Sequence, residues 1–275
     1  MPIGASREGH FAHASRTPGG AKTPLNQRAR QKLILALDFP SLDLALETAQ
    51  SLSSVVGIFK INIHLFTAEG PPAVEKLNGL GPGIFLDLKF HDIPNTVKGA
   101  VASAIALPGV QLLDVHALGG LEMMRAAVKA RDEAKGANSA VPKLLAITIL
   151  TSMDNAALRG VGIAGPASKR VVQLARLAKK AGMDGVVASP QEVRAIRRAC
   201  GRDFLIVVPG IRPVFGSRPD GGRKRKMDDQ ARFATPREAI RAGADYLVIG
   251  RPITGAPDPE AAARAILEEI SSALP

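Results

Sequence analysis

Eight short apolar runs recur along the chain, and each contains or ends in a polar residue or a glycine. Runs that lack regular polar alternation are typical of strands buried on both faces of a sheet. We therefore expect eight buried strands, with the chemistry concentrated at their polar ends. The runs cover residues 33–37, 58–61, 84–88, 112–115, 144–150, 185–188, 204–208 and 246–249.

Segments with helical spacing and helix-start residues lie between these runs. Strand and helix alternate throughout, and eight such units in about 245 residues match the length of a (β/α)8 TIM barrel, an α/β fold. An open doubly wound sheet is the alternative, but no G-x-G-x-x-G motif follows the first run. The predicted helices cover residues 41–46, 95–107, 119–134, 166–181, 190–199, 236–242 and 258–270.

Composition agrees with one soluble domain. The 275 residues, 46% of them hydrophobic, can bury a large core. The longest weakly charged stretch, residues 100–113, is interrupted by Pro108 and is too short to span a bilayer, so we expect no membrane segment. Cys200 is the single cysteine, which excludes an internal disulfide framework and fits a reducing, cytoplasmic compartment.

The net charge of +11 is concentrated in two segments. Residues 1–32 hold six Lys or Arg against one acid, and residues 212–232 hold seven against three. A nucleic-acid-binding surface would instead spread basic residues among aromatic stacking partners, and this chain has no Trp and one Tyr. We therefore expect no nucleic-acid partner.

Residues 1–32 are rich in Gly, Pro, Ser and Arg and show no helical or strand periodicity. We predict that they form a disordered basic extension, and that residues 33–275 form the barrel domain. The extension lacks the apolar segment of a secretory signal. Its arginines leave an organellar transit peptide as an alternative to a passive cytoplasmic tail.

The segment FLDLKFHDIPNTV, residues 85–97, places three charged residues at the end of an apolar run. Side chains two apart on a strand share a face, so Asp87 and Lys89 should both point into the mouth of the barrel, and Asp92 follows in a loop. Burying such charges costs several kcal/mol unless they pair or meet a charged ligand. A structural ion pair is the alternative to a catalytic one.

These residues resemble the orotidine 5′-phosphate decarboxylase family. LDLKFHDIPNTV resembles its signature, and LALDF, ILTSM, VVPGIRP, DDQAR and YLVIGRPIT resemble its other site segments in the same order, from about residue 33 to residue 270. The D-x-K-x-x-D core alone is less specific, because metal-dependent sugar-phosphate decarboxylases and epimerases on the same barrel share it. Metal-dependent decarboxylation or epimerisation of a sugar phosphate is therefore the main alternative function.

The resemblance implies decarboxylation of orotidine 5′-phosphate to uridine 5′-phosphate, with no cofactor and no metal. Lys89 would stabilise the carbanion electrostatically and then protonate it. Asp87 would lie near the substrate carboxylate and disfavour the ground state. Lys60 would complete an alternating Lys-Asp array and bind a ribose hydroxyl. Asp38 would accept hydrogen bonds from the ribose, although it could equally cap the next helix.

The same resemblance implies a homodimer with shared active sites. Asp92, Ile93 and Thr96 would reach into the site of the neighbouring subunit, across a two-fold interface.

A phosphate site is expected after strands seven and eight, where this fold commonly places one. Gly250 and Arg251 follow strand eight, and a guanidinium beside a glycine N–H suits a phosphate dianion. By resemblance, Arg212 and Gln230 would close over phosphate and pyrimidine, and either Thr151 or Ser152 would bind the ring imide.

Residues 214–228 form an insertion that is longer and more basic than the family pattern. Its basic run, residues 223–226, could steer an anionic nucleotide or simply be solvated. His91 and His116 are expected to be structural, and no cluster has the spacing of a metal site.

Overall fold

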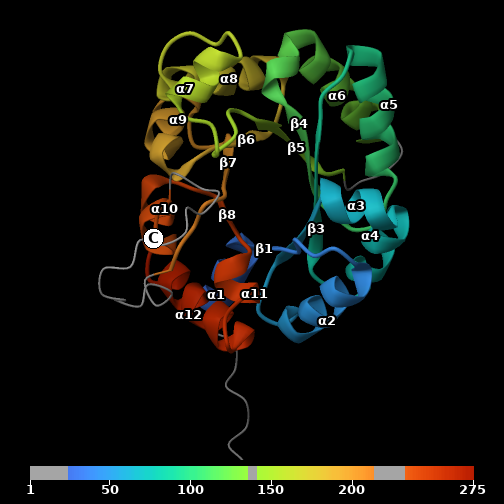
Figure 1. Ribbon diagram of the computed structural model, residues 1–275, viewed down its shortest axis with the longest axis vertical. Coiled ribbons are helices and arrows are strands. Elements are labelled where there is room, and N and C mark those ends of the chain that lie inside the picture. Colours follow the sequence, from blue (N-terminus) through green and yellow to red (C-terminus); the bar gives the residue numbers. More distant parts are fainter. Residues whose placement is uncertain (1–23, 136–140, 214–232) are drawn as a thin grey trace, which may run out of the picture.

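A computed structural model describes residues 24–135, 141–213 and 233–275 (Figure 1). Eight parallel strands follow one another in chain order around a closed barrel, and β1 pairs with both β2 and β8. The predicted TIM barrel is confirmed, and the open sheet is excluded. The strands are β1 (Leu33–Ala36), β2 (Ile58–Asn62), β3 (Gly83–Phe90), β4 (Val110–His116), β5 (Lys143–Ile147), β6 (Gly185–Val187), β7 (Leu205–Val208) and β8 (Tyr246–Ile249).

Helices surround the barrel as an outer ring (Figure 1). All seven predicted helical segments are helical, with ends displaced by a few residues. The α-helices are α1 (Pro24–Lys32), α2 (Leu42–Leu52), α3 (Ile63–Glu69), α4 (Pro71–Asn78), α5 (Pro94–Ile105), α6 (Gly120–Lys135), α7 (Asn155–Gly160), α8 (Ala167–Ala181), α9 (Val193–Cys200), α10 (Pro236–Ala242), α11 (Arg251–Thr254) and α12 (Pro259–Ser271). Two short 3-10 helices, η1 (Ala117–Gly119) and η2 (Pro190–Glu192), precede α6 and α9.

The strands bury both of their faces. One set of side chains fills the barrel interior, and the other packs against the helices. This double burial explains why the strands appear in the sequence as nearly continuous apolar runs. The interior set comprises Ile34, Ala36, Ile58, Phe85, Leu112, Leu145, Val207 and Val248.

The predicted disorder of residues 1–32 is wrong for residues 24–32, which form α1. Ala29 is fully buried, and the Arg30 guanidinium donates to the carbonyl oxygens of Val56 and Ser53, each at 2.9 Å. Gly57 makes this approach possible, since a Cβ there would lie 2.4 Å from the Arg30 carbonyl oxygen. Residues 1–23 lie outside the described part of the chain.

Helix α5 begins one residue earlier than Asn95. Ile93 occupies the N-cap position, and Pro94 follows it in the first turn. A backbone N–H in this first turn would have no partner within the helix, and a proline lacks that N–H. Helices α3, α4, α7 and α11 were not predicted. No helix among the described residues is long and apolar enough to cross a membrane.

Candidate active site

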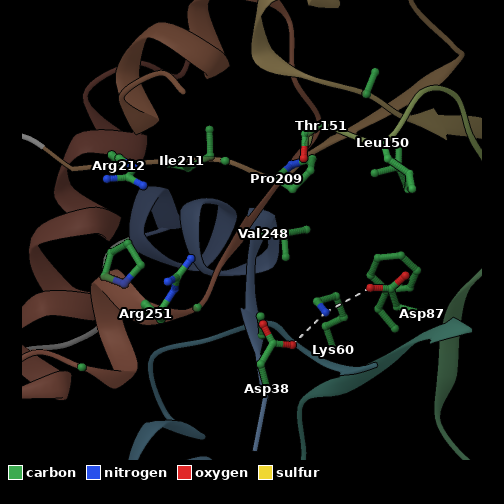
Figure 2. A pocket seen from close by; sticks show the side chains of 18 of the residues that line it. Asp38, Lys60, Asp87, Leu150, Thr151, Pro209, Ile211, Arg212, Val248 and Arg251 are labelled. Atoms are coloured by element: carbon green, nitrogen blue, oxygen red, sulfur yellow. Dashed lines mark hydrogen bonds and ion pairs between the residues drawn. The ribbon is translucent and has the colours of Figure 1, made fainter. Parts of the chain in front are cut away.

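A cavity of about 630 Å³ opens at the carboxyl ends of the strands (Figure 2). Apolar side chains of the barrel strands, among them Phe85, Ile147 and Val248, line part of it. Charged and polar residues surround this apolar surface. Eight residues predicted for the site line the cavity: Asp38, Lys60, Asp87, Lys89, Thr151, Arg212, Gly250 and Arg251.

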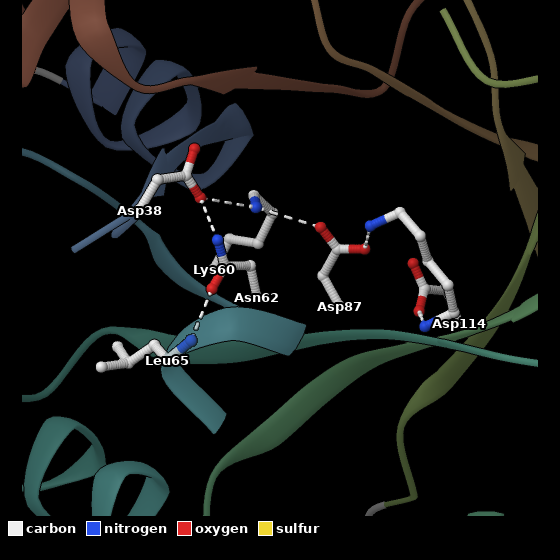
Figure 3. A network of polar contacts seen from close by, with 7 residues as sticks. Asp38, Lys60, Asn62, Leu65, Asp87 and Asp114 are labelled. Carbon is white, nitrogen blue, oxygen red and sulfur yellow. Dashed lines mark hydrogen bonds and ion pairs between the residues drawn. The ribbon is translucent and has the colours of Figure 1, made fainter. Parts of the chain in front are cut away.

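Four of these residues form a row of alternating charge across β1, β2 and β3 (Figure 3). Lys60 Nζ lies 3.2 Å from Asp38 Oδ1 and 3.0 Å from Asp87 Oδ2. Lys89 Nζ donates to the second oxygen of the Asp87 carboxylate, Oδ1. Asp87 is therefore held between two ammonium groups.

The charge row keeps its central groups ionised. Burial opposes the charge on Asp87, but Lys60 and Lys89 outweigh it and hold the pKa of this carboxyl below its usual value. Burial likewise opposes the charge on Lys60, and the carboxylates of Asp87 and Asp38 raise its pKa above the usual value. A neutral ligand would leave this preformed field unused, whereas a substrate that develops charge beside it would be stabilised.

Asp38 belongs to this row and does not cap α2. Its Oδ1 accepts from Lys60 and, at 2.9 Å, from Asn62 Nδ2. Ser41 occupies the N-cap position of α2, although its side chain accepts no capping hydrogen bond. Asn62 was not predicted for the site. It also caps α3 through Leu65 N, so the start of that helix holds the amide that orients Asp38.

The loops after β7 and β8 bring two arginines to the cavity, on the side opposite Asp87 (Figure 2). Arg251 begins α11, directly after Gly250. A Cβ at Gly250 would lie 3.3 Å from Ala36 Cβ and 3.6 Å from Asp38 Oδ2, so a glycine lets the ends of β8 and β1 approach closely. The Arg212 guanidinium lies 5.4 Å from the centre of the Phe233 ring.

Of the two candidates for the imide contact, Thr151 lines the cavity and Ser152 does not; Ser152 is exposed. Gln230 and the basic insertion at residues 214–228 lie outside the described residues, so the predictions made for them are untested.

The three residues expected to serve a neighbouring subunit do not line the cavity of their own chain. Asp92, Ile93 and Thr96 belong to a run of six consecutive exposed residues, 91–96. Asp92 Oδ1 accepts only a local hydrogen bond, from Ile93 N at 2.6 Å, among the contacts described. Ile93 is 66% exposed, which is unusual for a large aliphatic side chain.

His91 and His116 stack beside this segment, with ring centres 5.3 Å apart. His116 Nδ1 accepts from Leu118 N at 3.3 Å, so the ring caps η1 in its neutral form. This contact agrees with the expected structural role. Within the described ranges, no group of three or more His, Cys, Asp or Glu residues could hold a metal ion.

Residues 31–266 match the model of the orotidine 5′-phosphate decarboxylase / HUMPS family. The chain belongs to this family. The orotidine 5′-phosphate decarboxylase of Geobacter sulfurreducens is 54% identical over 244 residues, which cover 88% of this chain and 97% of the relative. That of Moorella thermoacetica is 50% identical over 248 residues, covering 90% and 94%.

Solved structures agree with this membership. Orotidine 5′-phosphate decarboxylase from Lactobacillus acidophilus superposes with a TM-score of 0.72 at 38% identity, covering 86% of this chain and 98% of that one. An uncharacterized conserved protein from Geobacillus kaustophilus gives 0.73 at 36% identity, covering 86% and 99%.

The family motif D-x-K occupies an irregular part of β3. Leu86 pairs with Leu113 of β4, but the next pair is Phe90 with Val115, so β3 holds two extra residues in this interval. Lys89 has φ of 52°, the one positive φ of a non-glycine residue in the described chain. Asp87 and Lys89 do face the cavity together as predicted, yet regular strand alternation alone does not produce their geometry.

Asp114 was also missed. It lies on β4 within a run that was interpreted only as apolar, and it is fully buried. Its Oδ1 accepts from Lys89 N at 2.8 Å. An aspartate inside an otherwise apolar buried strand was the available indication.

Proposed function

We propose that this member of the family decarboxylates orotidine 5′-phosphate to uridine 5′-phosphate and carbon dioxide, the last step of uridine monophosphate synthesis, without a cofactor. The observation that carries this proposal is the charge row Asp38, Lys60, Asp87 and Lys89, whose two central members are buried. Arg251 lies on the other side of the same cavity. The curated relatives at 50–54% identity are named orotidine 5′-phosphate decarboxylase, which favours this reaction over sugar-phosphate chemistry.

In the proposed reaction, the bond between the ring carbon and the carboxylate breaks, and its electron pair stays on the ring carbon. The Lys89 ammonium stabilises this pair and then transfers a proton to the same carbon. Asp87 repels the substrate carboxylate, and departure of carbon dioxide relieves that repulsion. The two lysines keep Asp87 ionised for this role.

The remaining site residues bind the parts of the substrate that do not react. Lys60 and Asp38 hold the ribose hydroxyls, and Arg251 with the Gly250 N–H holds the phosphate. Thr151 binds the ring imide, because it lines the cavity whereas Ser152 does not. Arg212 closes over the phosphate from the loop after β7, together with Gln230.

We assign a homodimer to this protein, in which Asp92, Ile93 and Thr96 complete the neighbouring subunit's site. The exposed run 91–96 supports this assignment, as do the exposed side chains of Ile63 and Leu118 at the same end of the barrel. An interface would bury these apolar groups. We place the enzyme in the cytoplasm and propose neither a nucleic-acid nor a membrane partner.

A substrate comparison tests the reaction. Purified protein in excess chelator is incubated separately with orotidine 5′-phosphate and with a sugar phosphate that lacks the pyrimidine. We expect loss of orotate absorbance with the first and no reaction with the second. A metal-dependent reaction of the sugar phosphate alone would instead identify the competing function.

A further inference from the structure

Asp114 lies inside the barrel, directly against the catalytic segment. Leu112 and Asp114 share the inward face of β4, while Leu113 and Val115 pack outward. Asp114 lies between Leu113 and Val115, the residues that pair with Leu86 and Phe90 on either side of the irregular part of β3. Among the charged residues of the described chain, Asp114 is the one with no exposed surface.

Each oxygen of the Asp114 carboxyl faces the charge row differently. Oδ1 accepts a hydrogen bond from the Lys89 backbone N–H at 2.8 Å. This N–H lies in the irregular part of β3, where the regular pairing with β4 is interrupted. Oδ2 is fully buried and receives no hydrogen bond from a donor of the described residues. The carboxyl group is nevertheless within hydrogen-bonding reach of the Asp87 side chain. Two carboxylates cannot bond to each other unless one of them carries a proton.

We propose that Asp114 is a positioning residue for the decarboxylation, whose neutral carboxyl group fixes both the left-handed backbone of Lys89 and the orientation of the Asp87 carboxylate. The inference rests on the reaction proposed above. It assigns the two contacts to two different atoms: Oδ1 accepts from Lys89 N, and the acid proton on Oδ2 is donated to Asp87.

The electrostatic environment supports a neutral Asp114. Complete burial and the neighbouring Asp87 carboxylate raise the pKa of Asp114 well above its usual value. The proton belongs on Asp114 because two ammonium groups contact Asp87, and no side-chain cation contacts Asp114 among the described ion pairs. The left-handed conformation at Lys89 is unfavourable for a non-glycine residue, so it needs an external partner to persist.

Two substitutions separate positioning from packing. Asp114→Asn keeps an oxygen for Lys89 N–H and gives Asp87 an N–H donor, so we expect kcat within about tenfold of wild type. Asp114→Leu has a similar size but loses both contacts, and kcat should fall by about 10² because small misplacements of reacting groups carry penalties of that order. KM should change by less than about threefold in both variants, since neither touches the substrate.

Crystal structures of both variants provide a second readout that is independent of activity. In Asp114→Leu, Lys89 should leave positive φ, or its ammonium should lose Asp87; in Asp114→Asn both features should remain. Equal kcat values for the two variants, or an unchanged Lys89 backbone in Asp114→Leu, would overturn the inference. Should Asp114→Leu fail to fold, Asp114→Ala is judged by the same criteria. If the wild-type protein does not turn over the substrate, the proposed reaction is refuted. The variant crystal structures would then still test whether Asp114 fixes the Lys89 backbone and the Asp87 contact.

Discussion

Lys60 Nζ lies 3.0 Å from Asp87 Oδ2, and the two side chains are each only 10% exposed. Such a buried pair contributes little to stability, because removing both charges from water offsets most of their attraction. The pair is better explained by chemistry. Lys60 contacts one oxygen of the Asp87 carboxylate and keeps this group ionised. Lys89 contacts the other oxygen, on the side where a reacting carbon could approach.

Lys89→Ala should reduce kcat by at least about 10⁴-fold, because it removes both the stabilising cation and the proton donor. The fold should persist, since Lys89 lies at the barrel mouth outside the packed aliphatic layers. Steady-state kinetics and circular dichroism measure the two effects. Lys129→Ala on the exposed face of α6 is the matched control and should retain wild-type turnover. Wild-type-like turnover by Lys89→Ala would refute its role.

Asp92→Asn and Lys89→Ala subunits should complement each other if Asp92 acts across a dimer interface. A heterodimer then has one site with both wild-type contributions, so a randomly mixed equimolar sample should regain about a quarter of wild-type activity. Activity is measured after mixing and subunit exchange, with heterodimers verified by native mass spectrometry. Inactive heterodimers would show that Asp92 serves its own subunit.

Arg251→Ala should lower kcat/KM by about 10², because it removes a charge-assisted bidentate contact to the phosphate. The loss should persist from about 0.05 M to about 0.5 M salt, since a direct contact is screened far less than a distant charge. The control is Arg264→Ala, on the exposed side of α12. A loss that vanishes at high salt would assign Arg251 to long-range attraction alone.

His116 should make the folded state less stable in mild acid. Partial burial, the neighbouring His91 and Lys89 lower its pKa to about 4, against about 6.5 in an unfolded chain. Between these values the unfolded state binds a proton that the folded state does not, so stability falls as pH decreases from 6.5 toward 4. Wild-type Tm should therefore drop more than that of His116→Asn between pH 7.5 and pH 5. Equal drops would contradict this assignment.

The barrel could be predicted because every strand is buried on both faces, which leaves continuous apolar runs in the sequence. The positions of Asp38, Lys60 and Arg251 followed from the same logic, because the carboxyl ends of parallel strands meet at one edge. Helix α1 escaped prediction, since its stability comes from Arg30 and Ala29 packing on the barrel rather than from its own periodicity.

The geometry at Lys89 could not be predicted from strand periodicity. Its positive φ arises where β3 carries two extra residues against β4, and a register shift leaves no local mark in an apolar run. Asp114 accepts the hydrogen bond from Lys89 N within this irregular interval, so its contact was equally hidden from the sequence pattern. The roles proposed for Asp92 and Ile93 require a second subunit, so neither a local sequence pattern nor the fold of one chain can test them.

Turnover of orotidine 5′-phosphate by the wild-type protein in excess chelator tests the central claim most directly. The measurement follows orotate absorbance, released carbon dioxide and the nucleotide product in one reaction. We predict one equivalent each of uridine 5′-phosphate and carbon dioxide per substrate consumed, at a rate that the chelator does not change. Absence of turnover by folded, dimeric protein, or turnover that requires added metal, would contradict the claim.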